Sequence, residues 1–593
     1  MSDHAHGHDA GFIEKVRTVR VQATSEVYDA IVVGSGMSGG WAAKELTEKG
    51  LKTLVLERGR NVEHGTDYIT EHRTPWETPF RGRGDRRHAE ERQFRQSKAG
   101  PYNENTAHWY VDDVDNPYET EDETEDEFLW VRGYHLGGRS VMWGRQSYRL
   151  SEMDFTANER EGRGTRWPVT YDEIDPWYSY VERFAGISGE SMGLQQLPDS
   201  EFLPPMPLTA VENRVKESIA RDYNGRAMTV GRTAILTQPH NEGGVQRAGC
   251  HYCGPCDRGC SAGAYFCSLS TTLRAAQNTG NMTIRPHSIV HSLVYDDDAD
   301  RVTGVRVIDQ ETKEEMVFNA KLVFLNASAI GSAMILMNST SPRFPDGLGN
   351  QSGLLGKGIM DHHFMVGASG EFPEFADRYY FGNRPNGIYI PRFQNLPWDP
   401  SSNRDFTRGY GYQGGSGRGN WSRAASGPGV GVALKESLRN PGEWTFTMFP
   451  FGEILAYDDN RVELTDQTDD YGMPIPRIVG SIRDNERRMR VAMKSDGAEM
   501  LEAAGAVNVT EWEAPYRLGE GIHEMGTARM SATPETGCVD SNNRVHEIPN
   551  LYVTDGAFMT SAGCQNPSLT YMAFTARACD HAVNAVNSGD LRV

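Results

Sequence analysis

The feature that most constrains the fold is a glycine-rich turn between two short apolar runs near the N-terminus. The first run, Ala30–Val33, predicts a buried strand, and it leads directly into the turn GSGMSG at residues 34–39. Residues 41–49 then have the composition of a helix, and a second apolar run at 53–56 ends on Glu57. Strand, glycine turn, helix, strand and acid form the context in which this glycine spacing indicates a dinucleotide site.

Each glycine of the turn has a separate task in such a site. Gly34 permits the tight turn, Gly36 lets the backbone approach a pyrophosphate, and Gly39 allows the helix and strand to pack closely. The N-terminus of the helix would face the phosphates with unpaired N–H groups. Glu57, 23 residues after Gly34, is placed to accept a hydrogen bond from a ribose hydroxyl. The pattern predicts a bound dinucleotide without saying which one.

Length and charge limit the remaining possibilities. A chain of 593 residues should hold more than one hydrophobic core, so we expect two domains. The net charge of −21 argues against nucleic acid or an anionic membrane as a partner. No apolar run is long enough to cross a bilayer. The first residues, MSDHAHGHDAGF, lack the basic and apolar regions of a secretion signal, so we expect the chain to carry none of its own.

Four of the eight cysteines crowd into eleven residues, as Cys250-x2-Cys253-x2-Cys256-x3-Cys260. This spacing is that of a bacterial ferredoxin run, although Ser261 stands where those ferredoxins carry proline and no second half is present. The spacing favours an iron–sulfur cluster. Structural zinc is second, because zinc sites usually split their ligands into two separated pairs, and disulfides are third, because such short loops strain most pairings.

A redox cluster beside a dinucleotide site also restricts the dinucleotide. A cluster carries one electron at a time, whereas a nicotinamide exchanges hydride as an electron pair. A flavin can do both. The two motifs together therefore predict FAD rather than NAD. The other cysteines are scattered, and we expect them to be buried thiols; they are Cys267, Cys538, Cys564 and Cys579.

With further motifs, nearly the whole chain resembles the glucose–methanol–choline (GMC) oxidoreductases. Those motifs are Gly137-Gly138-x-Ser140, Gly356-Lys-Gly358-Ile-Met-Asp361-His362, His523-Glu-Met-Gly526-Thr527 and Asp555-Gly556…Asn566-Pro567-x-x-Thr570. The resemblance implies an α/β fold (α+β overall), with a Rossmann-like FAD-binding domain of discontinuous segments and a second, substrate domain built on an antiparallel sheet. The implied FAD-binding segments are 25–165, 246–345 with the cysteine loop, and 518–593. The implied substrate segments are 166–245 and 346–517.

The same resemblance assigns roles to single residues. It places the catalytic pair on His523, which can take a hydroxyl proton, and Asn566, which can hold that hydroxyl so that the C–H bond faces flavin N5. The implied FAD contacts are Gly34, Gly36, Met37, Gly39, Glu57, Arg58, Gly138, Ser140, Asp555, Gly556, Asn566, Pro567 and Thr570. FAD should be noncovalent, because Met142 stands where some pyranose oxidases of this family carry the histidine that bonds to the flavin. Glu453 is either an accessory group or a surface carboxylate.

The cysteine loop resembles one branch of the family. Cys250-x5-Cys256-x3-Cys260 followed by SAGAY is similar to bacterial FAD-dependent glucose dehydrogenase catalytic subunits, which implies a [3Fe–4S] cluster with Cys253 as a bystander, or a [4Fe–4S] cluster with Cys253 as a ligand. The likeness also implies a small subunit with a twin-arginine signal and a cytochrome c acceptor. The chain would then reach the periplasm by hitch-hiking on that partner, and would otherwise be cytoplasmic.

In its overall likeness the chain resembles the glucoside 3-dehydrogenase branch, which implies oxidation of the C-3 hydroxyl of glucosides and disaccharides to a ketone. Three alternatives stay open at this point. The first is a dehydrogenase of the same family that acts on C-1 of glucose or on another sugar or polyol. The second is an oxygen-using oxidase with a structural metal in the cysteine loop. The third is a non-enzymatic flavin-binding assembly subunit braced by zinc.

Overall fold

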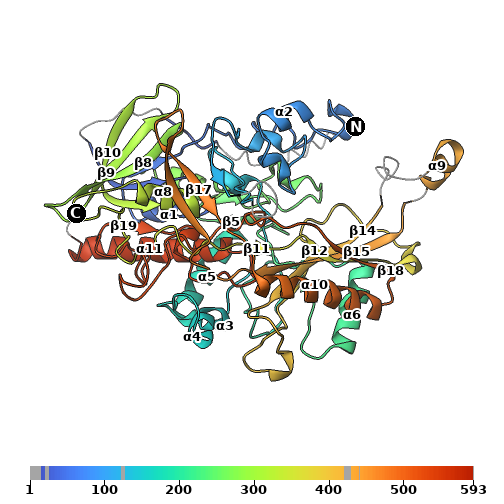
Figure 1. Ribbon diagram of the computed structural model, residues 1–593. Helices are drawn as coiled ribbons and strands as arrows, with labels where there is room; N and C mark the ends of the chain where they lie inside the picture. Colours follow the sequence, from blue (N-terminus) through green and yellow to red (C-terminus); the bar gives the residue numbers. More distant parts are fainter. Residues whose placement is uncertain (1–14, 20–25, 122–126, 420–428, 440, 592–593) are drawn as a thin grey trace, which may run out of the picture.

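The structure is a computed structural model that describes residues 15–19, 26–121, 127–419, 429–439 and 441–591. The N-terminal stretch on which the expectation about a secretion signal rests lies outside these residues. Two large sheets stand side by side, the first on the left of Figure 1 and the second on the right. Among the described residues, no helix has both the length and the apolar character that crossing a bilayer requires.

The first sheet is built around the glycine turn. β1 (Val27–Val33) pairs in parallel with β2 (Thr53–Leu56) on one side and with β10 (Glu315–Leu325) on the other. The strand order is β7-β2-β1-β10-β9-β8, and β19 also pairs with β10. The remaining strands are β7 (Met282–Arg285), β8 (Ser288–Asp296), β9 (Arg301–Asp309) and β19 (Leu551–Val553). β8, β9 and β10 form an antiparallel meander, as the alternating pattern of this segment predicts.

Helices cover this sheet and bring distant parts of the chain to it. The helix after the glycine turn, α1 (Met37–Glu48), packs against α11 (Ser568–Ser588), and α11 packs in turn on α5 (Tyr171–Ala185). α5 begins with the predicted capping box, because the Glu173 carboxylate accepts hydrogen bonds from the backbone N–H and hydroxyl of Thr170, at 2.7 and 3.0 Å. Two more helices of this half are α7 (Thr272–Asn278) and α8 (Ala329–Met337).

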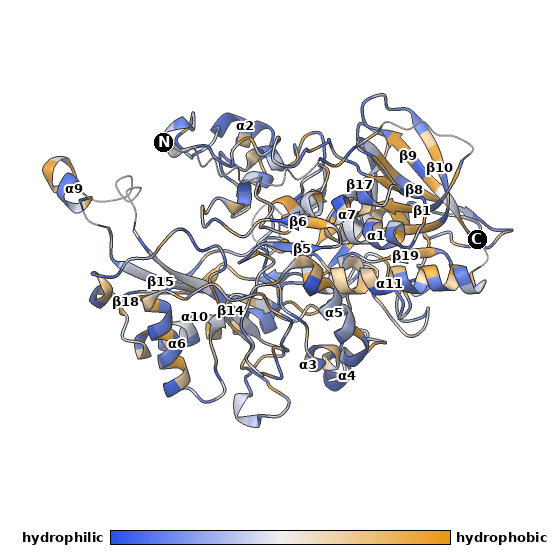
Figure 2. Cartoon of the chain, turned by 180° about the vertical axis from the view of Figure 1, so that it is seen from behind, coloured by the Kyte–Doolittle hydropathy of each residue, from blue (hydrophilic) through white to orange (hydrophobic). Residues whose placement is uncertain are grey.

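The second sheet is antiparallel at every pairing described, in the order β18-β12-β15-β14-β13-β4, with β11 on β15. α10 (Asp484–Ala503) and α6 (Ala210–Asp222) lie against it, and α6 alternates between blue and orange in Figure 2, as an amphipathic helix does. The strands are β4 (Thr229–Val230), β11 (His362–His363), β12 (Val366–Glu371), β13 (Ile388–Ile390), β14 (Tyr410–Arg418), β15 (Trp444–Glu453) and β18 (Val507–Glu513).

Smaller elements complete the described chain. A three-stranded sheet joins β16 (Arg461–Thr468), β17 (Pro474–Val479) and β3 (Glu119–Thr120), and β5 (His240–Glu242) pairs with β6 (Val245–Arg247). The short helices are α2 (Arg86–Glu91), α3 (Glu152–Phe155), α4 (Ala157–Glu161) and α9 (Gly431–Ser437). The predicted fold class is confirmed: a Rossmann-like βαβ unit in a mixed sheet, and a second antiparallel sheet. The five predicted segment boundaries stay predictions.

Candidate active site

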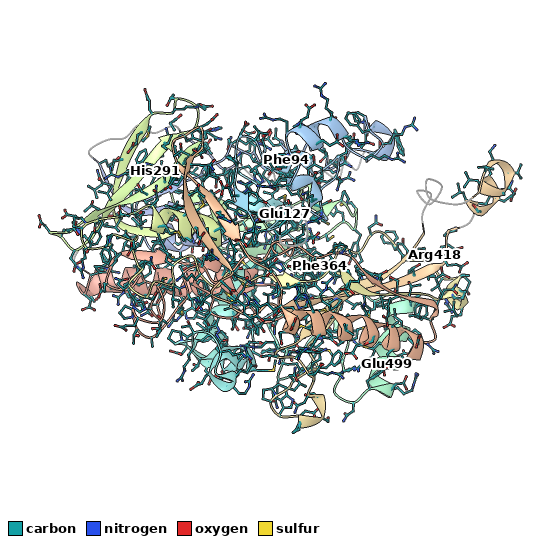
Figure 3. All side chains as sticks on the ribbon, viewed as in Figure 1. Phe94, Glu127, His291, Phe364, Arg418 and Glu499 are labelled. Atoms are coloured by element: carbon teal, nitrogen blue, oxygen red, sulfur yellow. The ribbon has the colours of Figure 1, made fainter. Side chains whose placement is uncertain are left out.

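A cavity of about 540 Å³ lies where the two sheets meet. Its lining comes from both halves: the glycine turn after β1 on one side, and Gln413 of β14 and Phe451 of β15 on the other. Phe364, which Figure 3 labels near the centre of the molecule, stacks on Phe451 with ring centroids 5.2 Å apart. These two rings form an apolar wall next to His523, so a ligand held there is shielded from water on one side.

The glycine turn forms one end of the cavity, and its three glycines have different surroundings. Gly34 has a φ of +97°, and a Cβ added to it would lie 2.4 Å from the carbonyl oxygen of Asn326. A Cβ on Gly39 would lie 2.0 Å from the carbonyl oxygen of Gly34. A Cβ on Gly36 would meet no heavy atom within 4 Å, because Gly36 faces the open cavity. The first and third glycines therefore permit the backbone packing, and the second leaves room for a ligand.

A second glycine turn faces the first. A Cβ on Gly138, which has a φ of +50°, would lie 3.3 Å from the Cα of Gly36, so this close approach favours glycine at position 138. The Ser140 hydroxyl accepts a hydrogen bond from Ser268 N–H at 3.0 Å and donates one to the Gly137 carbonyl at 2.5 Å, which braces the turn. The two turns thus form a slot with bare backbone on both walls, which suits a flat or phosphorylated group.

Two buried carboxylates also line the cavity. Glu57, at the end of β2, accepts hydrogen bonds from the backbone N–H groups of Ser35 and Gly59 at 3.1 and 2.8 Å, and burial raises its pKa. Asp555 accepts from Ala557 N–H at 3.0 Å and from the Ser332 hydroxyl at 2.5 Å, and burial raises its pKa to about 6. The Glu57 carboxylate therefore orders the glycine turn, and its predicted hydrogen bond with a ribose hydroxyl stays a prediction.

The polar atoms of this slot that lack a partner among the described residues fit a bound FAD. The buried side-chain oxygen of Asn326, beside the glycine turn, and Nε of Arg58 have no hydrogen-bond partner within the described chain, so a bound ligand could satisfy them. The Arg58 guanidinium lies over the Tyr134 ring, 4.4 Å from its centroid. Of the expected FAD contacts, these line the cavity: Gly34, Gly36, Met37, Glu57, Arg58, Gly138, Ser140, Asp555, Gly556, Asn566 and Pro567.

Two expected FAD contacts lie behind the lining. Gly39 is packed against the backbone of Gly34, as described above, and contributes close packing. The Thr570 hydroxyl lies 2.9 Å from the hydroxyl of Tyr178, where α11 meets α5. A direct contact of Thr570 with the cofactor therefore stays a prediction.

The predicted catalytic pair does come together. The Asn566 side-chain amide donates to Nε2 of His523 at 3.3 Å, and both residues line the cavity. On the far side of Asn566, the Gln413 amide donates to its Oδ1 at 2.6 Å. On the far side of His523, its Nδ1 lies 2.9 Å from Nδ1 of His362. Burial lowers the pKa of His523 well below its ordinary value, and the neighbouring His362 and the Arg139 cation lower it further. His523 is therefore neutral at pH 7.

One further carboxylate builds the loop that carries His523. Asp361 is fully buried and accepts hydrogen bonds from the backbone N–H groups of Gly519, Gly521 and His523 at 2.9, 2.9 and 3.0 Å, and from the Tyr516 hydroxyl at 3.0 Å. Sequence reasoning missed Asp361, His362 and Gln413 as functional residues. The first two stand inside a motif that was recognised, so a signal was present. For Gln413 there was none.

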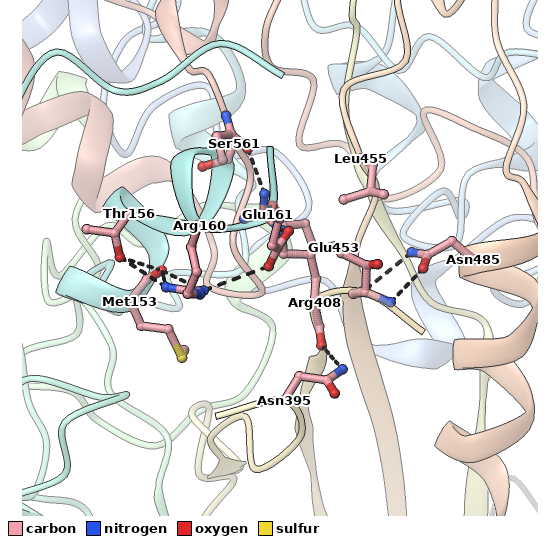
Figure 4. A network of polar contacts seen from close by, with 12 residues as sticks. Met153, Thr156, Arg160, Glu161, Asn395, Arg408, Glu453, Leu455, Asn485 and Ser561 are labelled. Atoms are coloured by element: carbon pink, nitrogen blue, oxygen red, sulfur yellow. Dashed lines mark hydrogen bonds and ion pairs between the residues drawn. The ribbon is translucent and has the colours of Figure 1, made fainter. Parts of the chain in front are cut away.

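The prediction for Glu453 needs a correction. The alternative that it is a surface carboxylate is wrong, because Glu453 is only 1% exposed. Its Oε1 accepts from Ala562 N–H at 3.3 Å and lies 3.5 Å from Nη1 of Arg408, whose Nε pairs with Glu161 at 2.7 Å. Figure 4 shows Glu453 and Arg408 within this polar network, and neither residue lines the cavity. Glu453 is therefore placed to support the loop that leads to Asn566.

The cysteine loop lies near Arg145, a residue of the cavity lining. Cys250, Cys256 and Cys260 are half-buried and Cys253 is exposed. Burial raises the pKa of the Cys256 thiol and the Arg145 cation opposes that rise, while Arg145 itself lines the cavity. Within the described ranges, no three or more His, Cys, Asp or Glu side chains are placed so that they could hold a metal ion. The thiols are thus not assembled as a ligand set in this conformation. The four other cysteines are buried, as predicted.

Comparisons with known proteins agree with this geometry. The chain is 26% identical to 2-methyl-1,2-propanediol dehydrogenase of Mycolicibacterium austroafricanum, over 93% of this chain and 94% of that protein. It is 26% identical to paromamine 6'-oxidase of Streptomyces fradiae (93% and 90% covered) and 24% identical to the fructose dehydrogenase large subunit of Gluconobacter japonicus (95% and 98%). A solved structure of an Aspergillus oryzae formate oxidase variant superposes with a TM-score of 0.59 at 15% identity, covering 96% of this chain and all of that one, which shows a shared fold.

Two family models, both described as "GMC oxidoreductase", match the chain at residues 28–364 and 456–575. Together these cover most of the chain, and they include the glycine turn, His523 and Asn566. The match confirms the resemblance inferred from the motifs and excludes the alternative of a non-enzymatic assembly subunit. The chain therefore belongs to the GMC oxidoreductase family, and it is an FAD-dependent oxidoreductase that acts on CH–OH groups.

Proposed function

We propose that this enzyme is a sugar dehydrogenase that oxidises a secondary hydroxyl of a pyranoside to a ketone, at C-3 of glucosides or disaccharides. The observation that supports a hydroxyl substrate is the convergence of Nε2 of His523 and the side-chain amide of Asn566 at one point of the cavity wall, 3.3 Å apart. A hydroxyl group both donates and accepts, so it fits between an acceptor and a donor. Relatives named for sugar substrates, such as the fructose dehydrogenase large subunit, support the choice of a sugar.

The side chains perform separate parts of this reaction. Asn566, held through its Oδ1 by Gln413, donates to the substrate oxygen and fixes its position. His523, neutral because burial lowers its pKa, takes the hydroxyl proton at Nε2. The bound flavin supplies the acceptor for the carbinol hydride. The stacked rings of Phe364 and Phe451 keep water from that side of the site.

The decisive experiment mixes the FAD-loaded enzyme anaerobically with glucose, a methyl glucoside and a disaccharide. We expect the glucosides to bleach the flavin, and NMR of the product should place the ketone at C-3. An aldonolactone from glucose alone would favour oxidation at C-1 instead. His523→Ala should keep the yellow flavin but lower the rate of its reduction by about 100- to 10,000-fold, the usual contribution of a general base. An unchanged rate would remove His523 from the reaction.

We further propose that Cys250, Cys256 and Cys260 hold an iron–sulfur cluster, [3Fe–4S], or [4Fe–4S] if Cys253 joins them. The support is their spacing, their half-buried positions and the Arg145 cation, which lines the cavity. Burial raises the pKa of the Cys250 and Cys256 thiols, and this cation opposes the rise. Such a cluster would supply one-electron transfer to a cytochrome or dye. Because the thiols are not assembled in the structure, metal binding would have to draw the loop together.

Iron and acid-labile sulfide assays on anaerobically purified protein test this proposal. Cys256→Ser should lose the iron and slow reduction of cytochrome c, while single-turnover reduction of the flavin stays normal. The matched variant Cys253→Ser should keep the iron if the cluster is [3Fe–4S]. Zinc in place of iron, together with a high yield of hydrogen peroxide, would support the oxidase alternative and contradict the dehydrogenase proposal.

The partners and location belong to the same proposal. The relative named as a large subunit supports an assembly with at least one more chain. We propose a small subunit with a twin-arginine signal, which carries this chain to the periplasm, and a cytochrome c as acceptor. Co-expression with and without a small subunit that carries a twin-arginine signal, followed by cell fractionation, tests the route. Enzyme that reaches the periplasm without any partner would contradict it.

A further inference from the structure

The chain of hydrogen bonds behind the catalytic pair has a direction that its last member dictates. Nε2 of His362 lies 2.8 Å from the carbonyl oxygen of Gly563. A carbonyl oxygen only accepts, so Nε2 of His362 must carry a hydrogen and donate it. Burial lowers the pKa of His362 to about 4, so at pH 7 the ring is neutral and carries only this one hydrogen. Nδ1 of His362 is therefore an acceptor.

The same argument passes to the next ring. Nδ1 of His362 lies 2.9 Å from Nδ1 of His523, and an acceptor there requires that His523 donates. His523 is also neutral, because burial lowers its pKa, so its single hydrogen sits on Nδ1. Nε2 of His523, the atom next to Asn566 at the cavity wall, is left without a hydrogen.

The amides on the cavity side agree with this direction. Asn566 turns its NH2 group to the bare Nε2 of His523 at 3.3 Å, and its Oδ1 accepts from Gln413 at 2.6 Å. Donors and acceptors therefore match at every step from Gln413 to the Gly563 carbonyl. In the opposite direction Nδ1 of His362 would donate to Nδ1 of His523, so His523 would carry its hydrogen on Nε2, against the NH2 group of Asn566. The Gly563 carbonyl would then be left without a donor.

We propose that His362 is a positioning residue that fixes the tautomer of His523, with the hydrogen on Nδ1, so that Nε2 is free to accept the substrate proton. His362 does not pass the proton onward, because the next group in the chain is a carbonyl that cannot hold it. This role depends on Nδ1 of His362, which accepts the hydrogen bond from Nδ1–H of His523. The hydrogen bond from Nε2 of His362 to the Gly563 carbonyl only ensures that Nδ1 is the nitrogen without a hydrogen. This inference rests on the proposed role of His523 as base.

Three substitutions at His362 distinguish the hydrogen bond that it accepts from His523 from the one that it donates to Gly563. Asn places its Oδ1 near the position of Nδ1 and keeps the acceptor, but it does not reach Gly563. Gln can donate to the Gly563 carbonyl with its side-chain amide, but it has a carbon where His362 has Nδ1, so it cannot accept from His523. Leu has a similar volume but makes neither hydrogen bond. His363→Leu is the matched control, because this neighbouring imidazole is equally buried and both of its nitrogens lack a hydrogen-bond partner within the described chain.

The first measurement reads the tautomer directly and needs no turnover. In protein labelled with ring-15N histidine, the His523 signals are identified by their loss in His523→Asn. We expect the wild type and His363→Leu to carry the hydrogen on Nδ1, and His362→Leu to show a large share on Nε2. A wild-type His523 with its hydrogen on Nε2 would overturn the proposal, as would a tautomer that His362→Leu leaves unchanged.

The second measurement is the rate of flavin reduction by substrate under anaerobic conditions. We expect His362→Asn to stay within about 10-fold of the wild type, and His362→Gln and His362→Leu to fall by about 100-fold, within the range of a lost general base. If His362→Gln were faster than His362→Asn, His362 would act by tying the loop, and the tautomer role would be wrong. If no sugar reduced the wild-type flavin, the proposed function would fail, while the NMR result would still decide the tautomer.

Discussion

Two alanine substitutions in the glycine turn should separate cofactor binding from folding. Gly36 has a φ of −67°, which every L residue adopts, and an added Cβ meets no heavy atom within 4 Å. It faces the cavity, so its methyl group would occupy the space that we assign to the pyrophosphate. At Gly39 the added Cβ would lie 2.0 Å from the backbone oxygen of Gly34, which cannot move without changing the turn.

The expected magnitudes follow from these surroundings. Gly36→Ala touches no protein atom, so the free energy of unfolding of the apoprotein should change by less than about 0.5 kcal/mol. Displacing a charged phosphate from one of its hydrogen bonds costs about 1.5–3 kcal/mol, which raises the Kd for FAD about 10- to 100-fold. For Gly39→Ala, overpacking typically costs 1–3 kcal/mol, and we expect at least about 3 kcal/mol because the clash is with the backbone.

Thermal unfolding of the apoproteins measures the effect on stability. Titration with FAD, monitored by the quenching of flavin fluorescence, measures the effect on cofactor affinity. Gly417→Ala in β14 is the control, since its Cβ also meets nothing within 4 Å and it does not line the cavity. Gly36→Ala with normal unfolding and wild-type affinity for FAD would refute the placement of the pyrophosphate at this turn. Gly39→Ala with a normal melting temperature would refute the packing argument.

Three further predictions concern the base and its supports. Because burial, His362 and Arg139 all lower the pKa of His523, the rate of flavin reduction should stay level from about pH 8 down to pH 6.5 and fall only at lower pH, where the base becomes protonated; an acid limb centred above pH 6.5 would contradict this. Glu453→Ala leaves Ala562 N–H without an acceptor and removes one of the two carboxylates beside Arg408, which keeps Glu161, so it should lower the free energy of unfolding by about 1–3 kcal/mol. Glu453→Gln keeps an acceptor for Ala562 and should cost less than Glu453→Ala, as chemical denaturation can measure. Gln413→Glu replaces the donor to Asn566 with an acceptor and should slow flavin reduction by about 10-fold, with Gln413→Asn as the shorter variant that keeps a donor; an unaffected rate for Gln413→Glu would show that Asn566 needs no support there.

Local sequence signals predicted the dinucleotide half well. The glycine turn, both flanking strands and the capped helix α5 each depend on residues close together in the chain, and each is present. The helix after the turn was expected at residues 41–49 but begins at Met37, so Gly39 and Gly40 are helical. Helix propensity argues against two glycines there, yet a Cβ on Gly40 would lie 2.4 Å from the Thr272 hydroxyl. Close packing of α1 on α7 outweighs propensity.

The support of the catalytic pair could not be predicted in the same way. Gln413 precedes Asn566 by 153 residues and His362 precedes His523 by 161, and nothing local to Gln413 marks it. Only the approach of the second sheet to the first brings them together. Glu453 was open to a surface interpretation because a lone carboxylate is usually exposed. It is buried because it ends a central strand, β15, that is paired on both sides and covered by α10.

The position of the active site explains why these long-range contacts converge on one short loop. Three hydrogen bonds hold the segment 562–566. Ala562 N–H donates to Glu453 of β15, and the Gly563 carbonyl accepts from His362 of β11. The Gln565 amide donates to Asp154 of α3 at 3.1 Å. Three segments far apart in the chain therefore hold the backbone that ends in Asn566. Because the distance from Asn566 to His523 depends on all three, a substitution at any of them should act on the same proton transfer, although none of them touches the substrate. The catalytic geometry is thus a property of the junction between the sheets, and neither half could form it alone.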